Sequence, residues 1–363
     1  MKRRSHTSST SFFVEAAKTW MAGTSPAMTG RVTRTGIRRR EFITVLGGAA
    51  AAWPLAARAQ QSAMPVIGLL HGATLEGYAP MMTAFRKSLS EAGYSEGQNA
   101  TIEPRWAEGR LDRLPELAAD LVRRQVSVIF AGGGAEPALA AKAATSKIPI
   151  VFANGVDPVE VGLVTSLSRP GGNITGVSFL INTLGPKELE ALHDLRPQAT
   201  VIAALINPNL ATTASQSQDV EMAARALGLQ IRVLHASTER EIETVFASLP
   251  QVKADGLVIG ANAFFFSRRD QLVGLATRYS VPTVYPWREA VVAGGLMSYG
   301  ANVADAYRLA GNYIGRILRG EKPAGLPVQQ STNTELVINL KTAKSLGLTF
   351  PITLLGRADE VIE

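Results

Sequence analysis

Cysteine is absent from the 363 residues, and aromatic and charged residues make up only 6% and 18% of the chain. A chain without cysteine has no disulfides, no thiolate metal sites, no thiol nucleophile and no cysteine to carry a lipid anchor. Its four histidines are dispersed, and neither H-E-x-x-H nor G-x-S-x-G occurs. We therefore expect no catalytic group, no metal and no cofactor.

Nucleotide-binding signatures are missing as well. Three successive glycines at 132–134 follow an apolar run, but G-x-G-x-x-G would need a further glycine where Pro137 stands. No G-x-x-x-x-G-K-[ST] occurs anywhere in the chain. These absences argue against the interpretation that the protein is a nucleotide-dependent oxidoreductase, which remains the less favoured alternative.

The amino-terminal segment has the pattern of an export signal. Arg39 and Arg40 precede a modestly apolar run of 16 residues, 42–57, which ends in Ala57-Arg58-Ala59, an A-x-A cleavage site. The run is shorter than the ~20 residues of a membrane-spanning helix. We predict that residues 1–59 are an extension and a twin-arginine signal peptide, and that a periplasmic mature protein begins at 60. The alternative is a buried Ala-rich helix.

Removing the leader changes the charge of the protein. The whole chain has a net charge of +7, but residues 1–59 hold ten Lys/Arg and two Asp/Glu. Residues 60–363 therefore keep 27 basic and 28 acidic residues, a net charge of −1. The basic character belongs to the leader, so the sequence predicts no nucleic-acid partner.

After the leader, short apolar runs alternate with helical patterns in two successive series, which is typical of parallel sheets covered by helices. We predict an α/β fold with two doubly wound parallel-sheet lobes joined by a hinge. The expected lobes are 60–180 plus 300–323 and 181–299 plus 324–363. The predicted strands are 66–70, 101–107, 126–134, 149–155 and 173–179 in the first series, and 201–207, 231–237, 255–262, 281–287 and 295–301 in the second.

Candidate binding residues of the first series lie where strands end, the edge at which such sheets bind ligands. His71 ends the first strand. Gly133 and Gly134 precede a helix whose amides suit a carboxylate. Asn154 closes another strand, and Asp157 stands before a proline with Glu160 three residues on, which predicts a helix cap. A ligand ammonium is the alternative partner for this carboxylate.

In the second series, polar and aromatic residues gather near predicted strand ends. Asn207 stands before a proline, like Asp157, and is either a cap or a cleft residue. Asn262, Phe264, Tyr285 and Tyr299 would form a stacking pocket for a flat apolar ligand. Core packing is the alternative for each of the aromatic residues.

Long stretches of the chain resemble a known family. The leader, the run FRKSLSEAGYSEGQNATIEPRWAEGRLDRLPELAADLVRRQVSVIFAGGG, the stretch IPIVFANGVDPVEVGLVTSLSRPGGNITGVSF and the closing ELVINLKTAKSLGL are similar to ABC-transporter substrate-binding proteins of the tryptophan/tyrosine type. The resemblance covers 38–363. It implies a type I periplasmic-binding-protein fold with three crossovers, a ligand in the cleft, and Ala73, Phe264 and Trp287 as positions that choose the ligand.

The sequence thus indicates a periplasmic solute receptor that closes about a hinge and delivers a small molecule to an ABC permease in the inner membrane. An amino acid or an aromatic carboxylate is the favoured ligand, and we expect a monomer. A periplasmic sensor module that presents its closed form to a receptor remains an alternative.

Overall fold

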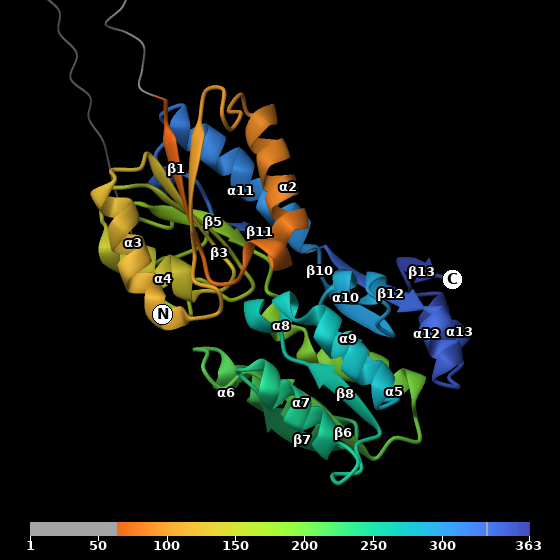
Figure 1. Cartoon of the computed structure of the whole chain (residues 1–363). Coiled ribbons are helices and arrows are strands. Elements are labelled where there is room, and N and C mark those ends of the chain that lie inside the picture. The colour runs from red at the N-terminus through yellow and green to blue at the C-terminus, as the bar shows by residue number, and fades with distance from the viewer. Residues whose placement is uncertain (1–63, 332) are drawn as a thin grey trace, which may run out of the picture. The chain divides into compact units, whose positions relative to one another are not determined.

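The computed structural model describes residues 64–331 and 333–363, so the expected signal peptide lies outside the described residues. Two sheets with helices on both faces form the described part of the chain, which confirms the expected α/β class (Figure 1). Every one of the ten predicted strands is present. Most central strands are buried along nearly their whole length, as parallel strands covered on both sides must be.

The first sheet has the order β11-β5-β4-β3-β1-β2 and is parallel throughout. Helices α2 and α11 cover one face, and α3 and α4 cover the other. The elements are β1 (Val66–His71), α2 (Leu75–Glu91), β2 (Thr101–Trp106), α3 (Leu114–Arg123), β3 (Val128–Gly132), α4 (Glu136–Ala144), β4 (Ile150–Asn154), β5 (Ile174–Ser178), α11 (Val303–Leu318) and β11 (Gln329–Gln330).

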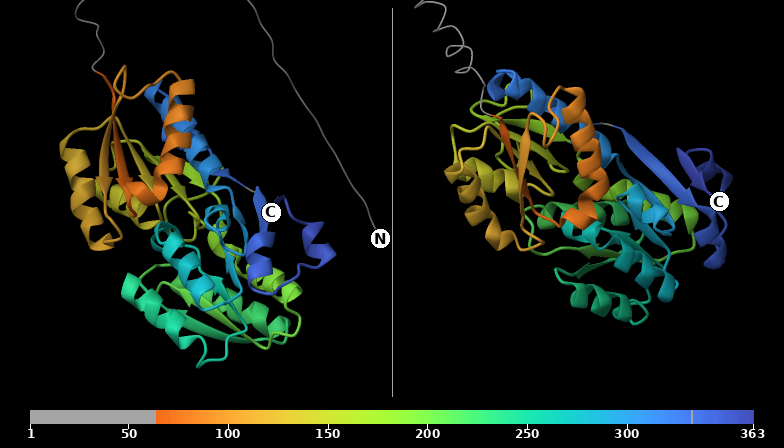
Figure 2. Two further views of the ribbon diagram at one scale, coloured as in Figure 1. Left: turned by 45° about the vertical axis from the view of Figure 1, so that its right-hand side comes forward. Right: turned by 45° about the horizontal axis from the view of Figure 1, so that its top comes forward.

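The second sheet has the order β13-β12-β10-β9-β8-β6-β7. Helices α5 and α6 lie on one face, with α7, α9 and α10 on the other (Figure 2). The elements are α5 (Gly185–Leu195), β6 (Val201–Ile206), α6 (Thr213–Ala226), β7 (Gln230–His235), α7 (Glu239–Ser248), β8 (Gly256–Ile259), α8 (Ala263–Ser267), α9 (Arg269–Arg278), β9 (Thr283–Tyr285), α10 (Arg288–Val292), β10 (Met297–Ala301), β12 (Thr334–Asn339), α12 (Leu340–Ser345), α13 (Ile352–Leu355) and β13 (Glu360–Ile362).

The chain passes between the sheets three times, at 179–184, at 302 and at 331–333. The third passage departs from the expected boundary at 323, because β11 pairs with β5 and keeps the first sheet's segment running to Gln330. The stretch 328–340 therefore holds two strands that belong to two sheets. Since the chain re-enters the second sheet at the carboxyl ends of its parallel strands, β12 runs antiparallel to β10.

Helix α11 packs closely on α2 through two glycines. A Cβ atom added at Gly311 would lie 2.8 Å from the carbonyl oxygen of Phe85, and one at Gly315 would lie 2.4 Å from Cβ of Ala92. Only glycine permits this approach of the two helix backbones. The close contact holds the carboxyl-terminal half of α11 against α2, on one face of the first sheet.

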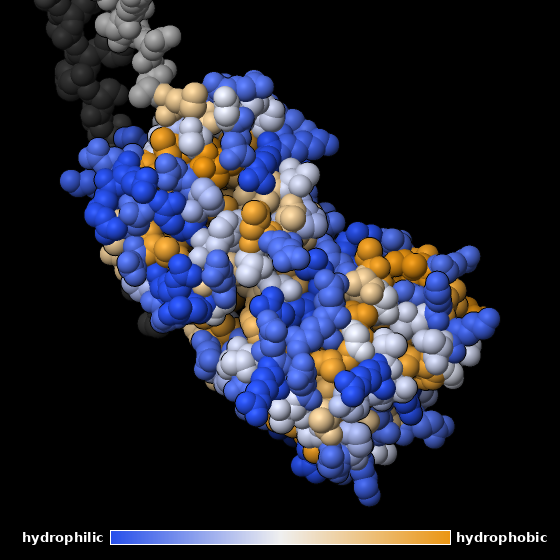
Figure 3. Space-filling model, viewed as in Figure 1, coloured by the Kyte–Doolittle hydropathy of each residue, from blue (hydrophilic) through white to orange (hydrophobic). Residues whose placement is uncertain are grey.

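The carboxyl-terminal segment leaves apolar side chains in solvent. Figure 3 shows hydrophobic colour over the part of the second sheet that carries β12, β13, α12 and α13. Ile352 of α13 is 87% exposed. Within the described ranges, no helix has the length and apolar character required to cross a bilayer.

A buried carboxyl on α5 generates a pH prediction. Glu188 is 2% exposed, has no hydrogen-bond partner among the described side chains, and faces a small cavity of about 20 Å³ beside Gln216. Burial raises the pKa of Glu188 well above 4.5, so the native protein keeps a proton that the unfolded chain releases. Its contribution to stability is therefore present below pH 4.5 and is lost as the pH rises.

We expect Glu188→Gln to gain stability over the wild type by about 1.4 kcal/mol for each pH unit above the unfolded pKa, until the native carboxyl ionises. Urea denaturation of both proteins at several pH values measures the difference. A difference in unfolding free energy that does not change with pH would contradict the assignment.

Candidate ligand-binding cleft

A cavity of about 500 Å³ lies between the two sheets, at the edges where their parallel strands have their carboxyl ends. Each sheet contributes residues that directly follow its strands, as parallel sheets with crossover helices do. The first sheet supplies Gly72, Gly133, Gly134, Gly155 and Phe179, and the second supplies Asn207, Ser237, Asn262, Phe264 and Trp287.

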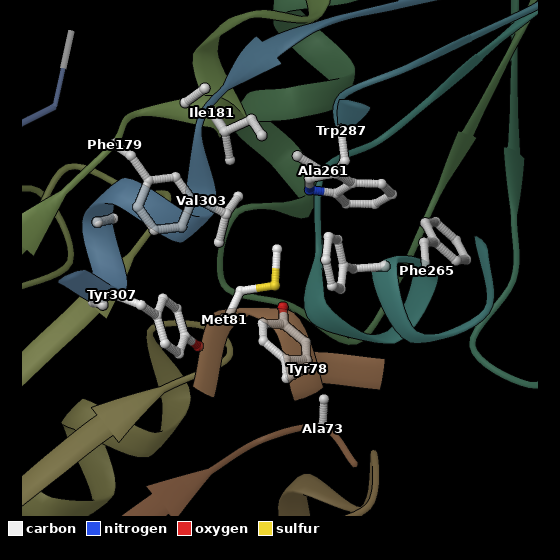
Figure 4. Packing of buried hydrophobic residues seen from close by; sticks show 14 of the residues in the cluster. Ala73, Tyr78, Met81, Phe179, Ile181, Ala261, Phe265, Trp287, Val303 and Tyr307 are labelled. Atoms are coloured by element: carbon white, nitrogen blue, oxygen red, sulfur yellow. The ribbon is translucent and has the colours of Figure 1, made fainter. Parts of the chain in front are cut away.

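The cavity walls are rich in aromatic rings. Tyr78 and Phe179 come from the first sheet's elements, and Phe264 and Trp287 come from the second. In Figure 4, Tyr78, Phe179 and Trp287 gather around a common space together with Val303. Such walls suit a flat or apolar ligand body. The lining has few charged residues, and Arg110 and Asp112 pair with each other at 3.3 Å on the exposed rim.

Contacts between the two halves close the cleft beside these rings. The guanidinium of Arg269 donates from Nη1 to the carbonyl oxygen of Gly77 at 3.1 Å. The rings of Tyr78 and Phe266 have centroids 4.6 Å apart. Helix α2 of the first half therefore contacts α8 and α9 of the second.

His71, predicted to contact the ligand, is fully buried beneath the cavity instead of lining it. Its ring packs against Tyr78 at 4.3 Å and Trp106 at 4.6 Å, between centroids. Its Nδ1 accepts a hydrogen bond from the backbone N–H of Ala73 at 3.1 Å, and its Nε2 lies 2.8 Å from the hydroxyl of Tyr307. Ala73 is also buried and does not line the cavity. Residues at the end of β1 therefore lie behind the cavity wall and do not line the cavity.

Gly133 and Gly134 do line the cavity, and both have left-handed φ angles of 74° and 122°. A Cβ at Gly133 would lie 2.4 Å from the His71 ring, and one at Gly134 would lie 2.5 Å from a carboxylate oxygen of Glu136. Both conformation and space therefore require glycine.

The carboxylate of Glu136 lies where the sequence predicted a ligand carboxylate. Burial raises the pKa of Glu136, and backbone N–H groups of Glu136, Ala211 and Ala135 oppose that shift. The protein's own carboxylate thus lies near the amides at the start of α4. Ala211 belongs to the second half, so this carboxylate lies near both sides of the cleft.

Asn154 and Asp157 do not line the cavity. Asn154 is 1% exposed, and its Oδ1 accepts from the N–H of Val156 at 3.4 Å. Asp157 accepts from the N–H groups of Val159 and Glu160 at 2.8 and 3.3 Å. The helix expected from Asp157 is instead a turn at 158–162, so the Asp157 carboxylate caps this turn.

Asn207 and Asn262, two of the predicted ligand-binding residues, line the cavity. Asn262 caps α8 by accepting from the N–H of Phe265 at 2.9 Å, and its Nδ2 donates to Gly260. Asn207 accepts from the N–H of Asn209 at 3.0 Å, while its Nδ2 has no partner among the described residues. Asn207 therefore keeps a donor available at the cavity.

Tyr285 and Tyr299 belong to the core, contrary to the predicted stacking pocket. Tyr285 is fully buried within the sheet and does not line the cavity. Tyr299 projects from β10 into the cluster that includes Leu189 and Leu192 of α5. Successive strand side chains alternate between faces, so a position near a strand end does not place a ring in the cleft.

The cavity is also lined by residues that the sequence did not predict, Tyr78, Phe179, Glu136 and Tyr307. Tyr78 lies in the first turn of α2, which follows β1 of the first sheet, and Tyr307 lies in the second turn of α11, which follows β10 of the second sheet. Both tyrosines lie on the apolar face of their helix, a pattern that indicates a core position. The sequence feature that could have identified them as cleft residues is a hydroxyl group in the first turns of a helix that follows a strand.

The sequence model of the ABC transporter substrate binding protein family matches residues 73–362. The chain belongs to this family. Its members are binding proteins, which decides against the enzyme alternative, and they work with ABC transporters. A tyrosine-binding protein of Clostridioides difficile is 28% identical over 264 residues, covering 73% of this chain and 75% of that protein.

Two solved structures of relatives resemble the fold and confirm the type I periplasmic-binding-protein architecture. An ABC domain from Streptococcus pneumoniae in complex with L-Trp is 26% identical, with a TM-score of 0.74. A ligand-free, open substrate-binding protein from Clostridium difficile is also 26% identical, with a TM-score of 0.59. Each comparison covers 82% of this chain and 99% of the other.

The burial of His71 predicts a loss of stability in acid. Burial lowers the pKa of His71 from 6.5 to about 3, so the unfolded chain binds a proton that the native protein excludes. The free energy of unfolding should therefore fall by about 1.4 kcal/mol per pH unit as the pH drops from the unfolded towards the native pKa.

His71→Gln removes this titration, so the stability advantage of the wild type over the variant should shrink between about pH 6.5 and pH 4. Denaturant unfolding at matched pH measures the difference. An advantage that stays constant over this range would show that His71 titrates normally in the native protein.

Proposed function

We propose that this chain is the periplasmic receptor of an ABC importer and that its ligand is an aromatic amino acid or a related aromatic carboxylate. The cavity with aromatic walls from both halves carries the proposal. Its volume of about 500 Å³ lies within the range of small-molecule sites. The relatives named for tyrosine and L-Trp support this class of ligand.

Hinge closure is the proposed mechanism. A ligand that contacts both halves stabilises the closed arrangement, and differential binding to that state supplies the free energy. The greater similarity to the L-Trp complex than to the ligand-free, open relative supports a closed arrangement here. The contact between Arg269 and Gly77 would then form on closure.

Export by the twin-arginine route would bring the receptor to the periplasm. The arginine pair, the short apolar run and the A-x-A site support this route and a mature start at Gln60. The closed receptor would be recognised by an ABC permease in the inner membrane, and we propose that it acts there as a monomer without a nucleic-acid partner.

Ligand binding should raise the melting temperature. A ligand at a hundredfold excess over its Kd stabilises the folded state by about 2.7 kcal/mol, which raises Tm by several degrees. We expect L-tryptophan, L-tyrosine or an aromatic carboxylate to produce this shift in a thermal melt of residues 60–363. Sugars and nucleosides are the controls, and a shift with these alone would overturn the proposed ligand class.

Export should depend on the arginine pair. Replacing Arg39 and Arg40 by lysine should leave the precursor in the cytoplasm, because the twin-arginine signal is lost while the charge is kept. Cell fractionation measures the distribution, and the unchanged chain is the control. Normal periplasmic delivery of the double variant would indicate another export route.

A further inference from the structure

The hydrogen bonds around Tyr307 leave its hydroxyl proton without a protein acceptor. The backbone N–H of Ala73 donates to Nδ1 of His71, so this nitrogen carries no proton. The buried ring is neutral, because burial lowers its pKa to about 3, and Nε2 therefore holds its one proton. Nε2 then donates to the Tyr307 oxygen at 2.8 Å. Tyr307 accepts in this bond, and no described residue accepts its own O–H.

Tyr78 supplies a second hydroxyl of the same kind. It is 6% exposed, lines the cavity and makes no hydrogen bond to a described residue. Figure 4 shows its oxygen directed into the group formed with Met81, Val303 and Trp287. The hydroxyl is accessible from the cavity and is therefore available to a hydrogen-bond partner that enters there.

The two phenols are neighbours. Their ring centroids are 5.9 Å apart, and both side chains line the cavity from the first sheet's side. Burial raises the pKa of both hydroxyls well above the usual value for tyrosine. Both therefore stay protonated and remain hydrogen-bond donors at neutral pH.

We propose that the hydroxyls of Tyr78 and Tyr307 bind the carboxylate of the ligand, and that His71 is a positioning residue that orients the Tyr307 O–H. The inference rests on the proposed function and deepens it by locating the acceptor end of the ligand. Because the Tyr307 oxygen already accepts from His71, it offers a proton, and a carboxylate offers the acceptor oxygens to receive it.

Few charged residues line the cavity, which leaves neutral hydrogen-bond donors as the groups that would bind the ligand carboxylate. Among the described lining residues, Arg110 is the one cation, and its side chain is 67% exposed and paired with Asp112. Glu136 adds an acidic group with internal amide partners. No guanidinium or ammonium of the described chain therefore lines the interior, and the ligand carboxylate would be held by hydroxyl donors.

The test is calorimetric titration of L-tryptophan and L-tyrosine into wild type, Tyr78→Phe, Tyr307→Phe and the matched control Tyr313→Phe. Tyr313 lies on the same helix, but its hydroxyl donates to the carbonyl of Pro327, away from the cavity. We expect Kd to rise about 10- to 100-fold in each of the first two variants, as for a lost hydrogen bond to a charged group. The control should stay within about twofold.

Tyr78→Phe keeps the test valid if Tyr307→Phe folds poorly, since the Tyr78 hydroxyl has no internal partner to lose. Its ligand-free melting temperature should match the wild type. If wild type binds an aromatic amino acid and both variants bind it equally well, the carboxylate site is wrong while the proposed function stands. If the wild type binds neither amino acid and no aromatic carboxylate, the proposed function itself fails.

A double-mutant cycle separates positioning by His71 from general support of the fold. His71→Leu should weaken L-tryptophan binding about 10-fold in the wild-type background but should add nothing to Tyr307→Phe. His71→Gln, which keeps an N–H donor, should restore part of the affinity. An equal loss from His71→Leu in both backgrounds would overturn the positioning role.

Discussion

The cleft depends on the parallel direction of the central strands in both sheets. Parallel strands joined by crossover helices end at one edge, so the loops that follow them collect there. Because the two edges face one another, the segments that follow strands of both sheets surround one cavity of about 500 Å³. The cavity is thus formed without a long binding loop, and residues of the helices line the rest of it.

Helix α11 connects this cavity to the second passage of the chain between the sheets. It begins directly after the passage at 302, packs on α2 through Gly311 and Gly315, and carries Tyr307 to the end of β3. Glycine at 132 leaves room there, since a Cβ would lie 2.6 Å from the Tyr307 hydroxyl. A ligand held by Tyr307 therefore contacts an element that starts at a connection between the halves.

The sequence suggested two groups that could bind a charged part of the ligand, the amides at the start of α4 and the carboxylate of Asp157. Both have neighbours within the protein instead. Glu136 lies near the amides at the start of α4, and Asp157 caps the turn that follows β4. The stretch 157–176, which begins at this cap, contributes no residue to the cavity lining. It builds the connection from β4 to β5.

The sequence alone determined the alternation of strands and helices, the α/β class and the edge where ligand residues gather. These follow from local apolar periodicity and from the geometry of parallel strands. Gly133, Gly134, Asn207, Asn262 and Phe264 lie at the cavity for that reason.

Only the tertiary structure decided which side chains at that edge face the cavity. His71 and Tyr285 also lie near strand ends, but the packing of α2, α10 and α11 buries them, and the helix residues Tyr78 and Tyr307 line the space instead. The stretch 328–340 is divided between two sheets by pairing with distant strands. Burial and pairing across long sequence separations have no local signal, because they depend on where other segments of the chain lie.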